Sequence, residues 1–221
     1  TRNLTAGEML SQIYQIQKDT KERVSNIIVM GMGEPLDNYE ELLRFIKLVS
    51  CEKGIGISQR NITVSTCGLV DKIRMLADEK LQITLAISLH APNDEIRRQT
   101  MPIANRYTIG EIIQACKYYF DKTGRRITFE YSMIRGVNDK EEHAKELAGR
   151  LSGLNCHINL IPLNEVKERN CYRSTKEDIE KFKTILEKYR KTVTIRREMG
   201  SDIDAACGQL RKKFLTKNGR N

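Results

Sequence analysis

The chain of 221 residues lacks any long hydrophobic run. A membrane-spanning helix needs about 20 consecutive apolar residues, and no segment of the sequence approaches that length. The first residues also lack the pattern of a secretory signal. Apolar residues make up 39% and charged residues 30% of the chain, as is usual for soluble globular proteins. The sequence therefore predicts a cytoplasmic protein with no membrane partner, long enough to bury the core of one domain.

Metal-binding signatures are absent as well. No two cysteines have C-x-x-C spacing, and the three histidines are spread along the chain. Without a secretory signal, we expect the cysteines to be free thiols in a reducing compartment, most of them buried packing residues. The six are Cys51, Cys67, Cys116, Cys156, Cys171 and Cys207.

Acidic residues are fewer than basic ones, 29 against 38, which gives a formal net charge of +9. This excess favours a polyanionic partner, although a generally lysine-rich surface gives the same balance. Several basic side chains gather late in the sequence, where they form either a phosphate-binding patch or a solvated face. They are Arg190, Lys191, Arg196, Arg197, Arg211, Lys212 and Lys213.

The apolar pattern alternates between helix and strand periodicity along the chain. Strands are expected at residues 26–30, 62–66, 83–89, 127–134, 156–161 and 193–197. Helices are expected at residues 5–22, 38–50, 69–77, 108–122, 139–151 and 174–189, with a short helical piece within 90–102. Strands separated by helices in this way indicate an α/β protein with a parallel sheet.

The stretch from Ile27 to Asn38, IIVMGMGEPLDN, is the centre of the predicted site. Its apolar run is typical of a strand buried on both faces. Gly31 and Gly33 would let backbone amides come close to a ligand, and Pro35 restricts Glu34 to extended backbone. A fixed carboxylate beside such amides suits a ligand that carries both an ammonium and a carboxylate. From this stretch alone, a glycine turn with a solvated Glu34 is an equal interpretation.

The loops after the expected strands hold most of the glycine, asparagine, serine, histidine and proline residues. They read GMGEP, STCG, SLHAP, IRGVND and IPLNE. In parallel β/α folds, ligands bind at the carboxyl ends of the strands, so these loops should converge on one face. That convergence favours a functional role for Glu34.

Five ordered motifs resemble the RlmN/Cfr family of radical S-adenosylmethionine (SAM) enzymes, which methylate adenosine in 23S ribosomal RNA. The motifs are GMGEP at 31–35, NITVSTCG at 61–68, LAISLHAPND at 85–94, INLIPLN at 158–164 and DIDAACGQLR at 202–211. Many radical enzymes carry a loop like the first motif, whereas the last is distinctive. The resemblance implies a partial (βα)6 barrel of the TIM type, SAM and a 4Fe–4S cluster as cofactors, an electron-donor protein as a partner, and a monomer. Transfer RNA is left open as a second substrate.

The resemblance also implies which residues contact SAM, with Glu34 holding the ammonium of its methionyl group. The implied contacts are Gly33, Glu34, Ser65, Ser88, Leu89, His90 and Asn164. A nucleoside with a zwitterionic tail needs a carboxylate, hydroxyl and amide donors and close backbone, which agrees with these residue types. The alternatives are local backbone hydrogen bonds for the two serines and a structural role in the loop for His90.

Cys207 resembles the cysteine that accepts a methyl group from one SAM molecule and carries it as a thioether. In the family, a second SAM molecule gives the radical that activates this methyl for transfer to adenine. A thiolate can attack a sulfonium methyl, and the small neighbours Ala205, Ala206 and Gly208 leave room for it. A buried cysteine in a turn of small residues is the alternative. Arg196, Arg197 and Arg211 flank Cys207 and are predicted to bind RNA.

The family's first strand, and the loop with three cluster cysteines that follows it, have no counterpart in this sequence. The resemblance therefore implies no metal ligand in this chain, cluster ligands upstream of Thr1, and no activity of the chain by itself. We expect residues 1–200 to form the truncated barrel, 201–214 to carry Cys207, and 215–221 to be a flexible tail.

Three alternatives remain beside methylation of adenosine C2 by an RlmN-type enzyme. Cfr-type methylation of C8 shares every motif quoted above. A different radical enzyme, such as a glycyl-radical activase, would share GMGEP but has no reason to carry DIDAACGQLR. A non-catalytic RNA-binding module would fit the missing cluster ligands.

Overall fold

The computed structural model describes residues 2–30, 33–163 and 172–197. Three residues of the predicted sites, Asn164, Cys207 and Arg211, lie outside these ranges, as does Cys171. So do the expected segments 201–214 and 215–221.

Among the described residues, six strands belong to one sheet and follow one another in chain order, from β1 to β6. The strands are β1 (Ile27–Val29), β2 (Ile62–Thr66), β3 (Thr84–Ser88), β4 (Ile127–Met133), β5 (Cys156–Pro162) and β6 (Thr192–Ile195). β1 pairs with β2, β2 with β3, and β5 with β6, all in parallel. The predicted α/β class with a parallel sheet is confirmed, and the sequential order is that of a partial β/α barrel.

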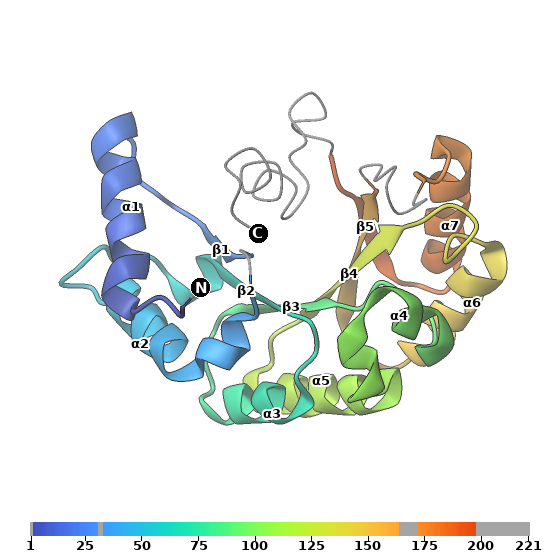
Figure 1. The fold of residues 1–221 in the computed structure, drawn as a ribbon, viewed down its shortest axis with the longest axis horizontal. Helices are drawn as coiled ribbons and strands as arrows, with labels where there is room; N and C mark the ends of the chain where they lie inside the picture. The colour runs from blue at the N-terminus through green and yellow to red at the C-terminus, as the bar shows by residue number, and fades with distance from the viewer. Residues whose placement is uncertain (1, 31–32, 164–171, 198–221) are drawn as a thin grey trace, which may run out of the picture. The chain divides into compact units, whose positions relative to one another are not determined.

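Helices alternate with these strands (Figure 1). They are α1 (Ala6–Thr20), α2 (Tyr39–Val49), α3 (Val70–Asp78), α4 (Asp94–Thr100), α5 (Ile109–Thr123), α6 (Glu141–Arg150) and α7 (Lys176–Lys188). Three short 3-10 helices are η1 (Pro35–Asn38), η2 (Gln59–Asn61) and η3 (Pro102–Asn105). The chain divides into a first unit, Thr1–Ser88 with Gly110–Thr128, and a second unit, Leu89–Ile109 with Phe129–Asn221.

In the first unit, α1 begins at a capping box, as the spacing of Thr5 and Glu8 predicts. The Thr5 hydroxyl accepts from the Glu8 N–H at 3.2 Å, and the Thr5 N–H donates to the Glu8 carboxylate at 2.9 Å. α1 packs against α2 (Figure 1), whose apolar side chains lie at helical spacing and are buried. These helices flank β1 and the loop that carries Glu34.

One expectation about this unit is wrong. The run Ile27 to Met30 predicts a strand buried on both faces, but Ile28 is 64% exposed and none of the β1 residues is fully buried. The physical reason is position, because β1 is the first strand in the order and pairs only with β2 among the described strands. An edge strand keeps part of its apolar surface uncovered.

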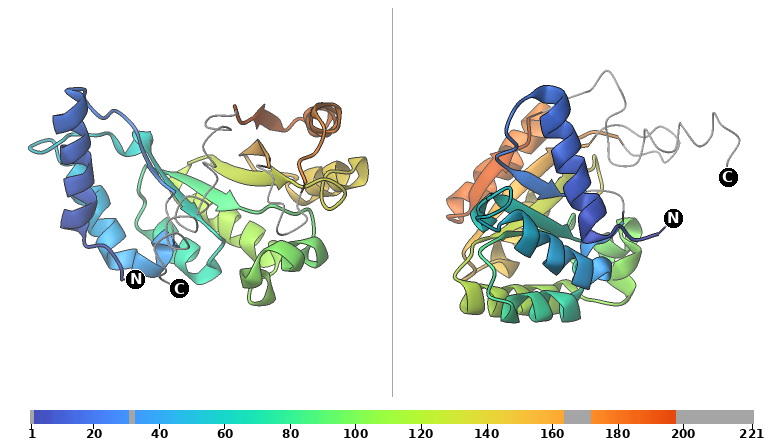
Figure 2. Two further views of the ribbon diagram at one scale, coloured as in Figure 1. Left: turned by 45° about the horizontal axis from the view of Figure 1, so that its top comes forward. Right: turned by 90° about the vertical axis from the view of Figure 1, so that its left-hand side faces the viewer.

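In the second unit, α6 and α7 lie side by side, as Figures 1 and 2 both show. The Tyr131 ring of β4 packs on Phe182 of α7 with the ring centroids 5.2 Å apart. Arg97 of α4 is fully buried and donates from Nε to the Leu89 carbonyl at 3.2 Å. This guanidinium therefore helps to fix the chain just after β3.

Two further expectations concern membranes and cysteines. No helix among the described residues is long and apolar enough to cross a bilayer. Of the four cysteines that the structure describes, Cys116 and Cys156 are buried, Cys67 is partly buried and Cys51 is exposed. The expectation that most are buried packing residues therefore holds for only two of these four.

Candidate functional site

Glu34 lies in the first unit, where two backbone amides hold its carboxylate. Oε1 accepts from the Leu36 N–H at 3.0 Å, and Oε2 accepts from the Cys67 N–H at 2.8 Å. The first bond makes Glu34 the N-cap of η1, and the second ties it to the loop after β2. Its backbone is extended, with φ −108° and ψ 113°, as the following Pro35 predicts. An ionised carboxylate has about four lone-pair sites, so both oxygens can still accept from a ligand.

Gly33 precedes this carboxylate in a conformation that requires glycine. Its φ is +103°, and a Cβ placed there would meet nothing within 4 Å. The conformation, rather than crowding, therefore explains the residue. The predicted approach of neighbouring amides to a ligand falls partly on residues 31–32, which lie outside the described residues.

Ser65 lies on the face of β2 that carries small side chains. Ile62, Val64 and Thr66 are buried, whereas Thr63 and Ser65 are only partly buried, as alternation along a strand requires. In register on β3, Ser65 is opposite Ala86, and Ser88 ends that strand two residues later. Among the described residues the Ser65 hydroxyl has no hydrogen-bond partner. The alternative that Ser65 bonds local backbone therefore has no support from the described geometry.

His90 lies in the second unit with its ring orientation and proton fixed. Its Nδ1 accepts from the Ser132 N–H at 3.0 Å, so the ring proton of the neutral form is on Nε2. Burial, and to a smaller extent the positive charge of Arg97, lower the pKa of His90 to about 4. Near neutral pH, His90 is thus an uncharged donor with a single N–H to offer.

Asn138, which sequence reasoning missed, holds the backbone around His90. His90 has φ +57°, which is unusual for a residue with a side chain. The fully buried Asn138 donates from Nδ2 to the carbonyls of His90 at 2.8 Å and Ser132 at 2.7 Å, while its Oδ1 accepts from the Ile134 N–H at 2.7 Å. These bonds satisfy the amide and stabilise the left-handed backbone of His90.

Leu89 is held by hydrogen bonds to both of its backbone polar groups. Its side chain is fully buried, its N–H donates to the Glu130 carbonyl at 3.1 Å, and its carbonyl accepts from Arg97. The Leu89 carbonyl keeps a second lone pair, and its contact with SAM stays a prediction. The buried Glu130 beside it is a second residue that the sequence analysis missed.

The predicted RNA-binding arginines are only partly described. Arg196 and Arg197 follow β6 and are exposed, and the Arg196 N–H donates to the Leu160 carbonyl at 2.8 Å. Arg211, Cys207 and Asn164 lie outside the described residues.

Glu34 and Ser65 belong to the first unit, while Leu89, His90, Arg196 and Arg197 belong to the second.

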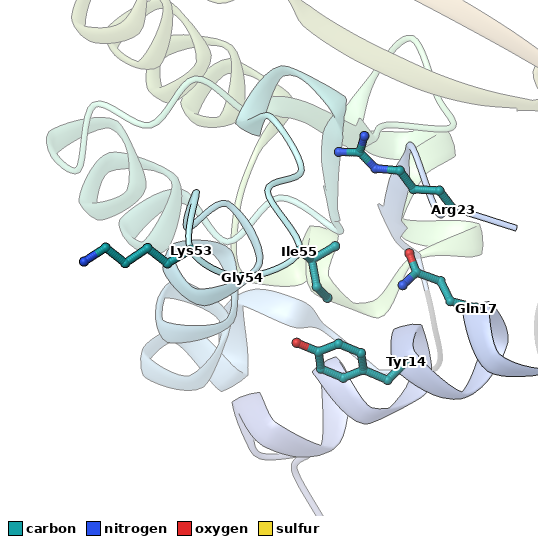
Figure 3. A pocket seen from close by; sticks show the side chains of 6 residues that line it. All are labelled: Tyr14, Gln17, Arg23, Lys53, Gly54 and Ile55. Atoms are coloured by element: carbon teal, nitrogen blue, oxygen red, sulfur yellow. The ribbon is translucent and has the colours of Figure 1, made fainter.

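Two hollows of ligand size lie within the first unit. One of about 460 Å³ is lined by α1, β1 and α2 and reaches Gly33, Glu34 and Pro35. The other, of about 430 Å³, lies between α1 and the loop after α2 and contains none of the predicted site residues (Figure 3). Tyr14 and Gln17 of α1 face Ile55 across it. Because only the first hollow reaches Glu34, we relate that one to the candidate site.

The described side chains offer no metal centre. Within residues 2–30, 33–163 and 172–197, no group of three or more His, Cys, Asp or Glu side chains could hold a metal ion. In chemical type, a carboxylate such as that of Glu34 suits the ammonium group of SAM, and uncharged groups such as the Ser65 hydroxyl and the His90 N–H each suit a ribose hydroxyl.

The sequence model of the Radical SAM superfamily matches residues 7–148 of the chain. The chain belongs to the radical SAM superfamily. This radical SAM chain is 62% identical over 214 residues to the probable dual-specificity RNA methyltransferase RlmN of Lachnospira eligens, covering 97% of the chain and 61% of that relative. It is 59% identical over 217 residues to the protein of the same name from Lachnoclostridium phytofermentans, covering 98% of the chain and 61% of that relative. The chain thus spans about three fifths of the length of these relatives.

Solved structures agree with this family. A radical SAM methyltransferase from Sphaerobacter thermophilus has a TM-score of 0.89 and 48% identity, covering 95% of this radical SAM chain and 62% of that one. A domain of pyruvate-formate lyase-activating enzyme from Bacteroides vulgatus has a TM-score of 0.59 and 21% identity, covering 79% of this chain and 100% of that one. The second likeness shows the fold alone.

Proposed function

We propose that the full-length protein is a radical SAM RNA methyltransferase that adds a methyl group to C2 of adenosine in 23S ribosomal RNA. Transfer RNA is the second candidate substrate. The observation that carries the proposal is the 62% identity, over 97% of this chain, to a relative named as a dual-specificity RNA methyltransferase. The proposal gives Cys207 the role of methyl carrier, as its motif implies.

The geometry of Glu34 supports SAM as the cofactor. Backbone amides hold both carboxylate oxygens in place, so the negative charge has a fixed position beside Gly33. A fixed carboxylate pays little conformational entropy when it binds an ammonium, and a charge-assisted hydrogen bond is stronger than a neutral one. Glu34 would therefore orient the methionyl end of SAM.

Ser65 and His90 suit the nucleoside end. The Ser65 hydroxyl is partly exposed, and the neutral His90 offers its Nε2–H. Both groups can bond ribose hydroxyls or ring nitrogens without a charge that would repel the sulfonium of SAM. When bound, SAM supplies both the methyl group and, with a reduced iron–sulfur cluster, the radical.

The proposal includes a 4Fe–4S cluster in the full-length protein. Its ligands are proposed to lie outside the described residues, because those residues contain no group that could hold a metal. Reduction of the cluster would need an electron-donor protein. Arg196 and Arg197 are exposed and would contact RNA phosphates, and Arg211 is proposed to bind RNA as well.

The test is nucleoside analysis of RNA that has been incubated with the full-length protein, with its cluster reconstituted. Incubation with SAM, a reductant and 23S RNA should give 2-methyladenosine, identified by mass spectrometry of the digested RNA. Cys207→Ala should abolish this product, whereas the exposed Cys51→Ala is the matched control and should keep it. Absence of any methyladenosine from the wild type would refute the proposal.

The runner-up is C8 methylation, which the same experiment distinguishes because it gives 8-methyladenosine. A glycyl-radical activase is less favoured, since the activating enzyme from Bacteroides vulgatus is similar only at 21% identity. A non-catalytic RNA-binding module would bind RNA but form neither product.

A further inference from the structure

Glu130 and Asn159 form a hydrogen-bonded pair in the second unit that the proposed function does not use. Asn159 of β5 donates from Nδ2 to Oε2 of Glu130 on β4 at 2.9 Å. Glu130 is only 6% exposed. Burial raises the pKa of this carboxyl, while the bond from Asn159 and the positive charge of Arg196 act in the opposite direction. A carboxylate buried to this degree needs more than one partner to offset its lost hydration.

Both side chains lie on the sheet face that points away from α7. Tyr131, the residue after Glu130, packs on Phe182 of α7, so Glu130 points to the opposite face. On β5, Ile158 and Leu160 are fully buried, and Asn159 between them lies on the other face. The pair is therefore not part of the packing between sheet and helices.

Glu130 is next to two of the residues predicted to contact SAM, Leu89 and His90. The Glu130 carbonyl accepts from the N–H groups of Leu89 and His90 at 3.1 and 3.2 Å. Glu130 is thus the strand neighbour of His90 within the same unit.

Thr194 fixes which atoms of Asn159 face Glu130. The Thr194 hydroxyl bonds Oδ1 of Asn159 at 3.3 Å and Nε2 of His157 at 3.0 Å. With Oδ1 directed to Thr194, the amide nitrogen is directed to Glu130, as an accepting carboxylate requires. The orientation of the amide is therefore determined by partners on both sides.

Each member of the pair keeps one unused hydrogen-bonding group. Among the described residues, neither Oε1 of Glu130 nor the second Nδ2 hydrogen of Asn159 has a partner. The first is a charged acceptor that is mostly buried, and the second is a donor close to it. An adjacent acceptor and donor are complementary to a ligand edge that presents a donor beside an acceptor.

We propose that Glu130 and Asn159 bind the amino-bearing edge of an adenine base. The Glu130 oxygen accepts from the N6 amino group, and the Asn159 amide donates to N7, the edge that asparagine and glutamine recognise in nucleic acids. Guanine presents O6 and N7, two acceptors, and the carboxylate would repel it. An adenine held by N6 and N7 leaves its C2 edge open.

This inference rests on the proposed function, which supplies two adenines, one in SAM and one in the target RNA. The chemistry of the pair is the same for either source. The experiment therefore has a cofactor arm and an RNA arm, both measured as binding to the full-length protein with its cluster reconstituted.

The decisive variant is Glu130→Gln. Asn159 would keep the oxygen of the new amide, so the atom that faces the ligand would change from an acceptor to an NH2 donor. In the cofactor arm, calorimetry compares SAM with an analogue whose adenine is replaced by purine, which lacks N6. In the RNA arm, competition binding compares RNA containing the target adenosine with RNA containing purine riboside at that position.

We expect the wild type to prefer the amino-bearing ligand by about ten- to a hundred-fold in one arm, the range for a hydrogen bond to a charged group. Glu130→Gln should lose that preference in the same arm. Glu180→Gln, on the exposed surface of α7, removes the same charge elsewhere and should keep the preference. The arm that responds identifies which adenine is bound.

An unchanged preference in both arms would overturn the proposal. Glu130→Gln could instead keep the N6 preference and lose its preference for ribose ligands over deoxyribose analogues. That result would indicate ribose binding and would also overturn the proposal. If Glu130→Gln does not fold, Asn159→Ala takes its place in the experiment. The wild type should prefer adenine over 7-deazaadenine, which lacks N7, and Asn159→Ala should lose this preference. Because both arms measure binding, absence of methyladenosine would refute the proposed function without removing a measured N6 preference.

Discussion

Replacing Glu34 by glutamine tests the best-defined contact of the candidate site. In the structure the two carboxylate oxygens accept from two different N–H groups, of Leu36 and Cys67, at 3.0 and 2.8 Å. A glutamine has only one oxygen, so its NH2 group would face one of these N–H donors. Glu34→Gln therefore removes the negative charge and also places a donor opposite a donor.

The size of each effect follows from these contacts. A hydrogen bond to a charged group contributes about 1.5–3 kcal/mol, and Glu34 is partly exposed, so solvent screening favours the lower end of that range. SAM affinity of the full-length protein should therefore fall by about ten-fold, and at most about a hundred-fold. Leaving one N–H without an acceptor should lower the free energy of unfolding by about 1–2 kcal/mol.

Isothermal titration calorimetry with SAM measures the first effect and denaturant unfolding measures the second. Asp37→Asn is the matched control, because it removes an exposed charge from the same 3-10 helix and should change neither quantity by much. Unchanged SAM affinity in Glu34→Gln would remove Glu34 from the cofactor site. A loss of stability without any loss of affinity would leave it as a structural cap.

Further predictions concern the second unit and the RNA surface. Asn138→Ala removes three buried hydrogen bonds around His90 and should lower the free energy of unfolding by about 3 kcal/mol or more. Chemical denaturation measures this change, and a loss below about 1 kcal/mol would contradict the assigned role. His90 has a pKa of about 4 when folded, whereas an unfolded histidine titrates near 6.5, so the unfolded chain takes up its proton first as pH falls. The free energy of unfolding should therefore drop by about 3 kcal/mol between pH 6.5 and pH 4. His90→Gln should flatten this pH dependence. An equal dependence of the unfolding free energy on pH in both proteins would show that other groups cause it. Charge reversal at Arg196, Arg197 and Arg211 should lower the slope of log RNA affinity against log salt concentration by about 0.7–0.9 per lost phosphate contact. If the variant keeps the wild-type slope, these arginines form only a solvated surface.

Local sequence predicted the elements and the Glu34 loop well. β2 lies at the predicted residues 62–66, because its apolar alternation and flanking polar residues leave little choice. Pro35 fixes the extended backbone of Glu34 from the adjacent position. Such features depend on neighbours in the chain, which a sequence displays directly.

The features that sequence reasoning missed depend on distant partners. Asn138 bonds the carbonyl of His90, 48 residues earlier, and Asn159 bonds Glu130, 29 residues earlier. Nothing in the local pattern of β4 distinguishes a buried Glu130 from a solvated one. The sequence does not predict the exposure of Ile28 for the same reason, because an apolar run does not reveal whether its strand lies at an edge.

The most direct test of the proposed chemistry is the mass of the peptide that spans Asp204 to Arg211. The full-length enzyme, with its cluster reconstituted, is incubated with methyl-labelled SAM and digested. We predict one added methyl group on Cys207 in this peptide, and transfer of that label to adenosine when RNA is added. Label on a different cysteine, such as Cys51, or methylated RNA from Cys207→Ala, would contradict the account.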